Sequence, residues 1–276
     1  MNSFSSFAFG IHAFDSLIRV QCYDAEIRDT LSRYIFPPLL RSDSVPPTPD
    51  IDVHLKQDET GTCILLNEEL LVSGIPHQDV ALATVKALDE AVVHRLKNFR
   101  AVHAGAVLVE GSAVLFPGST HAGKSTLVAE LLRRGASCFS DEYAIIDGNG
   151  RVHPYPRPLL LRDGSPQQSL VLPEELNSRF VTAPTPVGWI LAIDFVQRGE
   201  WNIHQISQSE AMTLLLRNTP HEMAESPQLF DFFLQAVSNV TCFSGRRGDA
   251  AQAAEKILQL VAASSSSAGF REHSRL

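Results

Sequence analysis

Apolar and polar residues follow each other along the first hundred positions in patterns that predict a small α+β unit. Residues 51–55 alternate between apolar and polar side chains, as a strand with one buried face does. Residues 80–93 carry apolar side chains three and four positions apart, which is the spacing of an amphipathic helix. This unit ends near Phe99 and contains no catalytic constellation, so we expect residues 1–99 to form a scaffold or substrate-docking domain. Its predicted elements are strands at 7–11, 16–21, 51–55, 63–67 and 70–73, helices at 24–31 and 80–93, and a proline-rich loop at 41–50.

From about Arg100 onward, the pattern predicts an α/β unit in which strands and helices follow one another. Two apolar runs at 104–109 and 111–116 are joined by a tight turn at Glu110-Gly111. Further predicted elements are strands at 136–139 and 187–195, a hairpin at 145–152, and helices at 125–134, 209–217, 227–237 and 249–262. The serine run 264–267 has the composition of a disordered segment. We therefore expect a second domain at 100–263 and a disordered tail at 264–276.

The composition changes this picture only by excluding classes of protein. Hydrophobic residues make up 44% of the 276 residues and charged residues 20%, as in ordinary soluble proteins. A net charge of −8 with scattered Lys and Arg argues against a nucleic-acid surface. The four cysteines lie far apart, which fits reduced thiols in a cytoplasmic protein. No apolar run is long enough to span a membrane, and the N-terminal segment is a poor signal peptide. Association into a homo-oligomer stays open.

The strongest chemical signal is the segment Gly-Ser-Thr-His-Ala-Gly-Lys-Ser at residues 118–125, here called the glycine loop. It matches G-x-x-x-x-G-K-[ST], in which backbone N–H groups surround phosphate oxygens. A predicted strand precedes it and a predicted helix follows it, which is the context that this motif requires. Lys124 is expected to reach the outer phosphates of ATP, and the Ser125 hydroxyl to bind Mg²⁺. The residues expected to hold the nucleotide are Gly118, Ser119, Thr120, His121, Ala122, Gly123, Lys124, Ser125 and Thr126.

Two carboxylates are expected beside this loop. Asp141 and Glu142 follow Lys124 by seventeen and eighteen positions. A helix from Ser125 to Arg134 carries the chain about 15 Å away, and a strand of about five residues brings it back over the same distance. We expect this strand to be parallel to its neighbours in an open sheet, where ligands bind at the carboxyl ends of the strands. Phosphoryl transfer needs one carboxylate for the metal and one for the proton of the attacking hydroxyl. The alternative is a solvated acidic turn.

Other polar residues carry weaker signals. His103 precedes small residues that leave space for a ligand, although a lone histidine before a strand is usually structural. Arg157 and Arg162 follow the core motifs and could contact phosphates. The pair Arg246-Arg247 precedes a helix and could bind a nucleotide or an acidic partner.

Taken together, these motifs resemble the HPr kinase/phosphorylase family. The resemblance rests on His103-Ala104-Gly105-Ala106, the glycine loop, Arg134-Gly135 and Ser140-Asp141-Glu142, and covers about Arg100 to Arg162. The family consists of bacterial protein-serine kinases with a phosphoenolpyruvate-carboxykinase-like nucleotide core. The chain is still more similar to HPr-kinase-related proteins of peptide-biosynthesis clusters, including lasso-peptide-tailoring kinases, which share the His-Ala-Gly-Ala and Ser-Asp-Glu forms and a Pro-rich segment like 154–161.

The resemblance implies a role for each matching residue. It implies that His103 lies at the acceptor phosphoryl site, that Asp141 is the general base, and that Glu142 is a carboxylate on the metal side. Glu142 and Ala104 depart from the Asp and Gly of the standard family. The glycine- and asparagine-rich segment that HPr kinases use for HPr docking and phosphorolysis is missing, which puts both properties in doubt for this chain.

The sequence thus favours an ATP- and Mg²⁺-dependent kinase with catalytic residues His103, Lys124, Asp141 and Glu142 and metal ligands Ser125 and Glu142. The expected fold is an α/β P-loop kinase core of the HPr kinase / phosphoenolpyruvate carboxykinase-like type with a small α+β N-terminal domain. The expected acceptor is a Ser of a peptide or protein, such as a precursor peptide of a lasso-type natural product. A small-molecule hydroxyl kinase and a non-catalytic nucleotide-binding regulatory module are the alternatives.

Overall fold

The computed structural model of the chain describes residues 7–36, 41–42, 45–119, 122–162, 167–224 and 229–272. Contacts between Cα atoms divide the chain into two compact units. Unit 1 contains the residues up to Phe99 together with two short segments from later in the chain, 156–158 and 162–170. Unit 2 contains 100–155, 159–161 and the residues from Val171 onward. Nothing in the local sequence pattern indicated that these two later segments would join the N-terminal unit.

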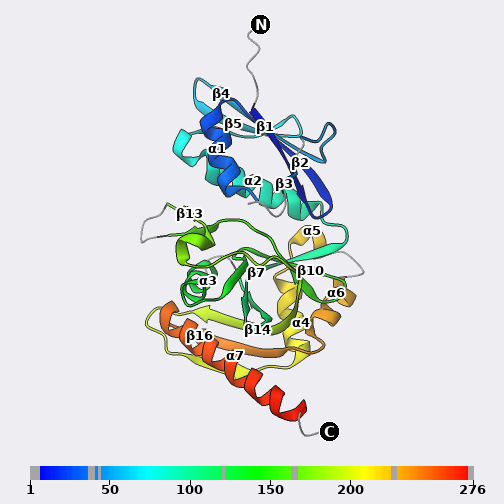
Figure 1. Cartoon of the computed structure of the whole chain (residues 1–276), viewed down its shortest axis with the longest axis vertical. Coiled ribbons are helices and arrows are strands. Elements are labelled where there is room, and N and C mark those ends of the chain that lie inside the picture. Colours follow the sequence, from blue (N-terminus) through cyan, green and yellow to red (C-terminus); the bar gives the residue numbers. More distant parts are fainter. Residues whose placement is uncertain are drawn as a thin grey trace. The chain divides into compact units, whose positions relative to one another are not determined.

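Unit 1 is a six-stranded sheet with helices packed on it (Figure 1). The strand order is β3-β1-β2-β4-β5-β6, and β2 and β4 are parallel neighbours. Alternate residues of these two strands, such as Ile18 and Val53, are fully buried. Helix α1 lies against β1, β2 and α2. The elements are β1 (Phe7–Ala13), β2 (Ser16–Cys22), α1 (Ala25–Tyr34), β3 (Arg41–Ser42), β4 (Ile51–Asp58), β5 (Gly61–Leu66), β6 (Glu69–Ile75), the 3₁₀ turn η1 (His77–Asp79) and α2 (Val80–His94).

The start of α1 and the loop before β4 show how local and distant contacts shape this unit. The Asp24 side chain accepts a 2.8 Å hydrogen bond from the Ile27 N–H, so the predicted helix start is confirmed as an N-cap. The loop predicted at 41–50 contains the short strand β3, which pairs Ser42 with Gly10 of β1. Composition could not show this pairing, because it depends on an edge strand elsewhere in the sheet.

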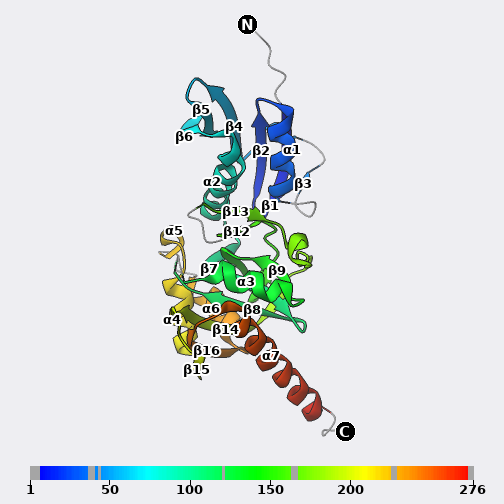
Figure 2. The same ribbon diagram turned by 90° about the vertical axis from the view of Figure 1, so that its left-hand side faces the viewer.

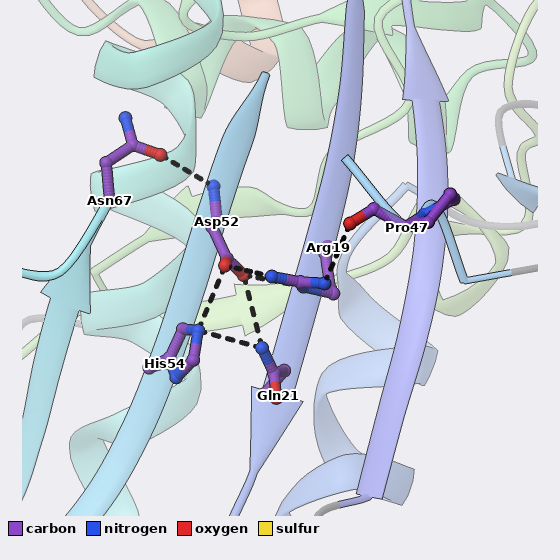
Figure 3. Close-up of polar contacts among 6 residues, drawn as sticks. All are labelled: Arg19, Gln21, Pro47, Asp52, His54 and Asn67. Atoms are coloured by element: carbon purple, nitrogen blue, oxygen red, sulfur yellow. Dashed lines mark hydrogen bonds and ion pairs between the residues drawn. The ribbon is translucent and has the colours of Figure 1, made fainter. Parts of the chain in front are cut away.

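The other alternating residues of β2 and β4 form a half-buried polar cluster, shown in Figure 3. The parallel register places Arg19 beside Asp52 and Gln21 beside His54. Both carboxylate oxygens of Asp52 accept hydrogen bonds from the Arg19 guanidinium, one of them at 2.9 Å from Nε. His54 Nε2 lies 3.0 Å from Asp52 Oδ2 and 2.8 Å from the Gln21 amide nitrogen. These partners, the guanidinium first, lower the pKa of Asp52 to about 2.

Unit 2 is built on an eight-stranded mixed sheet in the order β11-β10-β7-β8-β14-β16-β15, with β9 paired to β7. Strands β8, β14 and β16 are parallel neighbours. The strands are β7 (Phe99–Val109), β8 (Ser112–Pro117), β9 (Ser137–Ser140), β10 (Tyr143–Asp147), β11 (Arg151–His153), β14 (Thr185–Phe195), β15 (Asn202–Gln205) and β16 (Thr241–Arg247). The helices are α3 (Lys124–Arg133), α4 (Gln208–Arg217), α5 (His221–Ala224), α6 (Leu229–Val237) and α7 (Ala250–Glu272). The connections also contain β12 (Leu159–Leu161), β13 (Ser169–Val171) and the 3₁₀ turn η2 (Pro173–Leu176).

The sheet of unit 2 is covered on both faces, which makes this unit a three-layer α/β structure (Figure 2). On one face, Val114 and Phe116 of β8 belong to a core with α3 and α7. On the other face, Ala113 and Leu115 of the same strand belong to a core with α4 and α6. A strand buried on both faces needs a continuous apolar run, which is the pattern seen at 113–116. The predicted mixed α/β class is therefore confirmed.

Three features of unit 2 differ from the sequence-based expectation. Strand β9 is hydrogen-bonded antiparallel to β7, so it runs in the direction of β8, and it forms a parallel bridge from Cys138 to Phe180, which lies outside the named strands. Strand β16 lies between β14 and β15, although its sequence Thr-Cys-Phe-Ser-Gly-Arg-Arg contains too few apolar residues to predict a central strand. Helix α7 continues through the serine run to Glu272, where a disordered tail was predicted. Extending an existing helix requires no new nucleus, so residues of moderate propensity can continue it.

Candidate functional site

The candidate site lies in unit 2, where the glycine loop connects β8 to α3. Strand β8 ends at Pro117 and α3 begins at Lys124, so the predicted order of strand, loop and helix is confirmed. The loop leaves the carboxyl end of β8, at the same edge of the sheet as the ends of its parallel neighbours β14 and β16. Ligands bind preferentially at such edges. Two of the predicted phosphate-binding residues, Thr120 and His121, lie outside the described residues.

The second glycine of the loop is required by backbone conformation and by space. Gly123 is the N-cap of α3 and has a φ of +77°, a left-handed conformation that costs other residues energy. A Cβ atom at this position would lie 2.6 Å from Nη2 of Arg247 and 3.3 Å from Cβ of Phe195. The carbonyl oxygen of Gly123 accepts hydrogen bonds from the Leu127 N–H, at 3.1 Å, and from Arg247 Nη2, at 2.7 Å.

Lys124 closes the loop on itself. Its side chain is 8% exposed, and its ammonium group donates to the carbonyl oxygens of Gly118 at 2.8 Å and Ser119 at 3.0 Å. Burial lowers the pKa of this ammonium group, while the negative charges of Glu142 and Asp141 act in the opposite direction. The structure therefore brings Lys124 within electrostatic range of both predicted carboxylates. Ser125 follows in the first turn of α3 and is half-buried, and Thr126 is exposed.

The carboxylates lie at the turn between β9 and β10. Asp141 is 1% exposed, and its Oδ2 accepts a 3.3 Å hydrogen bond from the Leu160 N–H. Ser140 Oγ accepts from the N–H groups of Glu142 and Tyr143, each at 3.2 Å, and this holds the turn in place. Glu142 keeps 30% of its side chain exposed. Asp141 is therefore not part of a solvated acidic turn, because its side chain is buried. A buried carboxylate needs neighbouring groups that stabilise its charge.

His103 is joined to both parts of the site. Its Nδ1 lies 3.3 Å from Oε1 of Glu142, and its ring centroid is 4.5 Å from that of Tyr143. Its carbonyl oxygen accepts a 3.2 Å hydrogen bond from the Gly118 N–H at the start of the glycine loop. His103 thus links the loop to the carboxylate turn. Of the predicted catalytic residues, His103 and Glu142 are in direct contact. Lys124 is held in the loop that bonds to His103, and Asp141 precedes Glu142 in the turn.

The arginines predicted to bind phosphates or a partner differ in burial and in the groups that they contact. Arg157 belongs to unit 1, is 2% exposed and forms a 2.8 Å ion pair with Asp89 of α2, which is a structural role. Arg162 is exposed. Arg246 is exposed as well, whereas its neighbour Arg247 is 2% exposed and contacts the glycine loop. The sequence contained the Arg-Arg signal, but only the strand β16 decides which of the two points inward.

The described residues contain no group of three or more His, Cys, Asp or Glu side chains that could hold a metal ion by themselves. This does not conflict with Mg²⁺ binding at a phosphate loop, where the ion keeps water and phosphate ligands and takes only one or two from the protein. The Ser125 hydroxyl and the Glu142 carboxylate are oxygen donors of the kind that Mg²⁺ prefers. None of the helices within the described ranges is long and apolar enough to cross a membrane. All four cysteines are buried free thiols, as predicted.

The chain matches no protein-family model and no curated protein sequence.

Proposed function

We propose that unit 2 is an HPr-kinase-like serine kinase core that transfers the γ-phosphoryl group of ATP to a hydroxyl. The observation that carries the proposal is that His103 joins the two motifs: its carbonyl oxygen accepts from the Gly118 N–H of the glycine loop at 3.2 Å, and its Nδ1 lies 3.3 Å from Glu142 of the carboxylate turn. A binding module needs the cation to hold phosphates, but it has no need of a buried carboxylate beside them. Asp141, at 1% exposure, is such a carboxylate.

Each residue has a chemical role in this proposal. Lys124 exchanges its two loop carbonyls for phosphate oxygens and neutralises charge on the transferring group. Asp141 accepts the proton of the acceptor hydroxyl. At the same time the hydroxyl oxygen bonds to the γ-phosphorus, and the bond from that phosphorus to the ADP oxygen breaks. Ser125 and Glu142 would hold Mg²⁺, which supplies charge neutralisation for the phosphates. His103, whose Nδ1 lies 3.3 Å from Oε1 of Glu142, would contact the acceptor, as the resemblance implies.

For the acceptor we propose a serine in a flexible peptide or protein segment, with a precursor peptide of a lasso-type natural product as the specific candidate. The resemblance of the His-Ala-Gly-Ala and Ser-Asp-Glu segments to peptide-tailoring kinases supports this choice. Unit 1, which contains none of the residues of the candidate site, would hold the peptide and raise the local concentration of its serine.

The first test separates nucleotide binding from transfer. Calorimetric titration with a non-hydrolysable ATP analogue and Mg²⁺ should show binding to the wild-type chain and severe loss in Lys124→Ala. Lys56→Ala, which removes an exposed cation of unit 1, is the control and should bind like wild type. Equal affinity in wild type and Lys124→Ala would refute the assignment of the glycine loop.

The second test concerns transfer. Asp141→Asn should retain affinity for the ATP analogue and lose turnover by about 10² or more, as expected for a lost general base. Asp231→Asn on the exposed side of α6 is the control and should turn over normally. Acceptors are compared by mass spectrometry for a gain of about 80 Da, one phosphoryl group, using serine peptides, folded HPr and small hydroxyl compounds. Transfer only to small compounds would favour the small-molecule kinase, and binding without any transfer would favour a regulatory module.

A further inference from the structure

Arg247 is a buried cation that contacts the glycine loop from the end of β16. Its Nη2 donates to the Gly123 carbonyl at 2.7 Å, and its Nη1 donates to the Gly248 carbonyl at 3.1 Å. Its guanidinium carbon lies 5.5 Å from the ring centroid of Phe195, at the end of the neighbouring strand β14. Three loops at the carboxyl edge of the parallel strands therefore meet at this side chain.

The charge of Arg247 is not neutralised in a direct ion pair. No carboxylate among the described residues lies within ion-pair distance of the guanidinium, and Asp249 acts on it only at longer range. Its Nε is buried and has no hydrogen-bond partner among the described residues. Arginine stays protonated at physiological pH, so this is a fixed positive charge in a water-poor environment. Such a charge is costly to bury unless an anion shares its surroundings.

The hydrogen bond from Arg247 to the Gly123 carbonyl also helps to fix the direction of the next backbone N–H group, that of Lys124. A trans peptide is planar, so the N–H of Lys124 points opposite to the Gly123 carbonyl. That carbonyl accepts from both Arg247 and Leu127, which holds the peptide plane from two sides. The direction of the Lys124 N–H, the donor at the first helical residue after the loop, is thereby set by Arg247 together with Leu127.

We propose that Arg247 is a positioning residue for the nucleotide phosphates, which orients the peptide between Gly123 and Lys124 and adds a second fixed positive charge to that of Lys124. This inference rests on the proposed function, because it assumes that the glycine loop binds a phosphate chain. The ligand class that it favours is a nucleoside di- or triphosphate, since a chain with more negative charge gains more from a second cation.

The test uses the full chain with two substitutions at the site and one beside it. Arg247→Met keeps an unbranched stem, shorter than that of arginine, and removes the charge. Arg247→Lys keeps the charge and loses the planar fork, and Arg246→Met is the exposed control. The affinities for the ATP analogue, ADP and AMP with Mg²⁺ are measured by calorimetry at several salt concentrations. Thermal unfolding of each variant reports whether it is folded.

Arg247→Met is expected to bind the ATP analogue on the order of 10- to 100-fold more weakly, as for loss of a charge-assisted hydrogen bond, with a smaller loss for ADP and the smallest for AMP. Its affinity should also depend less on salt than that of wild type, because one charge is missing. Arg247→Lys should recover the salt dependence and part of the affinity. Arg246→Met should behave like wild type.

The outcomes separate this inference from the proposed function. If wild type binds nucleotide and Arg247→Met matches Arg246→Met within about twofold, the role of Arg247 is refuted and the kinase proposal stands. An equal loss for ATP, ADP and AMP with unchanged salt dependence would show a purely structural role and also refute it. If Arg247→Met does not fold, Arg247→Lys decides, because an affinity equal to wild type would contradict the requirement for the fork. Absence of nucleotide binding in wild type would overturn both proposals.

Discussion

Removing either partner of the ion pair between Asp89 and Arg157 should strongly destabilise unit 1, whereas replacing both with apolar residues should change its stability little. The pair joins α2 to residues 156–158, the short segment that unit 1 takes from later in the chain. Its side chains are 8% and 2% exposed, and the two charged groups are 2.8 Å apart. The cavity beside the pair measures about 10 Å³, the lower limit for a single water molecule. Little solvent is therefore present to stabilise either charge alone.

The expected destabilisation follows from the 2.8 Å separation of the two charged groups and from their burial. At an effective dielectric constant of about 20, two unit charges at this distance attract each other by about 6 kcal/mol. Desolvation of the two ions costs several kcal/mol each and cancels most of this attraction. The net contribution of the intact pair is therefore small, whereas removing one partner leaves the other charge buried without this ion pair. We expect Asp89→Leu and Arg157→Met each to destabilise unit 1 by about 3–5 kcal/mol, and the double variant to come within about 1 kcal/mol of wild type or exceed it.

The measurement is hydrogen exchange of the α2 backbone by mass spectrometry, which reports unit 1 separately from unit 2. Glu90→Gln, at an exposed position next to Asp89, is the control and should change stability by no more than about 0.5 kcal/mol. Single variants that lose less than about 1 kcal/mol, or a double variant that loses the sum of the two, would refute the reasoning. A truncation of residues 1–99 would leave Arg157 without its partner, which is why the functional tests use the full chain.

Three further predictions concern the glycine loop, the metal and pH. Gly123→Ala should abolish nucleotide binding and cost more stability in thermal unfolding than Gly111→Ala, because both glycines have φ near +77° but only Gly123 has atoms within 4 Å of the added methyl. Glu142→Gln should raise the Mg²⁺ concentration needed for half-maximal transfer while leaving binding of metal-free nucleotide unchanged. Asp52 should stabilise unit 1 by about 2 kcal/mol at pH 7, since its pKa falls from 3.8 to about 2 on folding. This contribution is fully present above the pKa of Asp52 in the unfolded chain, 3.8, and is lost as the pH falls through its pKa in the folded chain, about 2.

Each of these predictions has an outcome that contradicts it. Equal melting temperatures for Gly123→Ala and Gly111→Ala would show that the loop relaxes without cost. An unchanged Mg²⁺ requirement in Glu142→Gln would remove this residue from the metal side. For Asp52, hydrogen exchange of β2 and β4 should show the difference between wild type and Asp52→Asn shrinking to about half by pH 3. A difference that is constant between pH 7 and pH 3 would show that the Arg19–Asp52 pair contributes nothing through ionisation.

Local patterns along the chain were sufficient for much of the fold. Alternation predicted β4, and an apolar run predicted β8, because the residues of a strand reflect which of its faces are buried. Asp24 marked the start of α1, since a cap acts within three residues. The glycine loop could also be located from sequence, because its backbone conformation is imposed by its own glycines and by the strand and helix beside it.

The tertiary structure alone decided the features that depend on distant partners. Strand β16 has a polar sequence and becomes a central strand only because β14 and β15 supply its hydrogen bonds. That placement separates buried Arg247 from exposed Arg246, two residues that look alike in sequence. Arg157 was a candidate phosphate ligand until its pairing with Asp89, 68 positions away, assigned it to unit 1. Local sequence determines what each segment can form, whereas contacts between segments far apart in the chain determine which charges are buried and what they face.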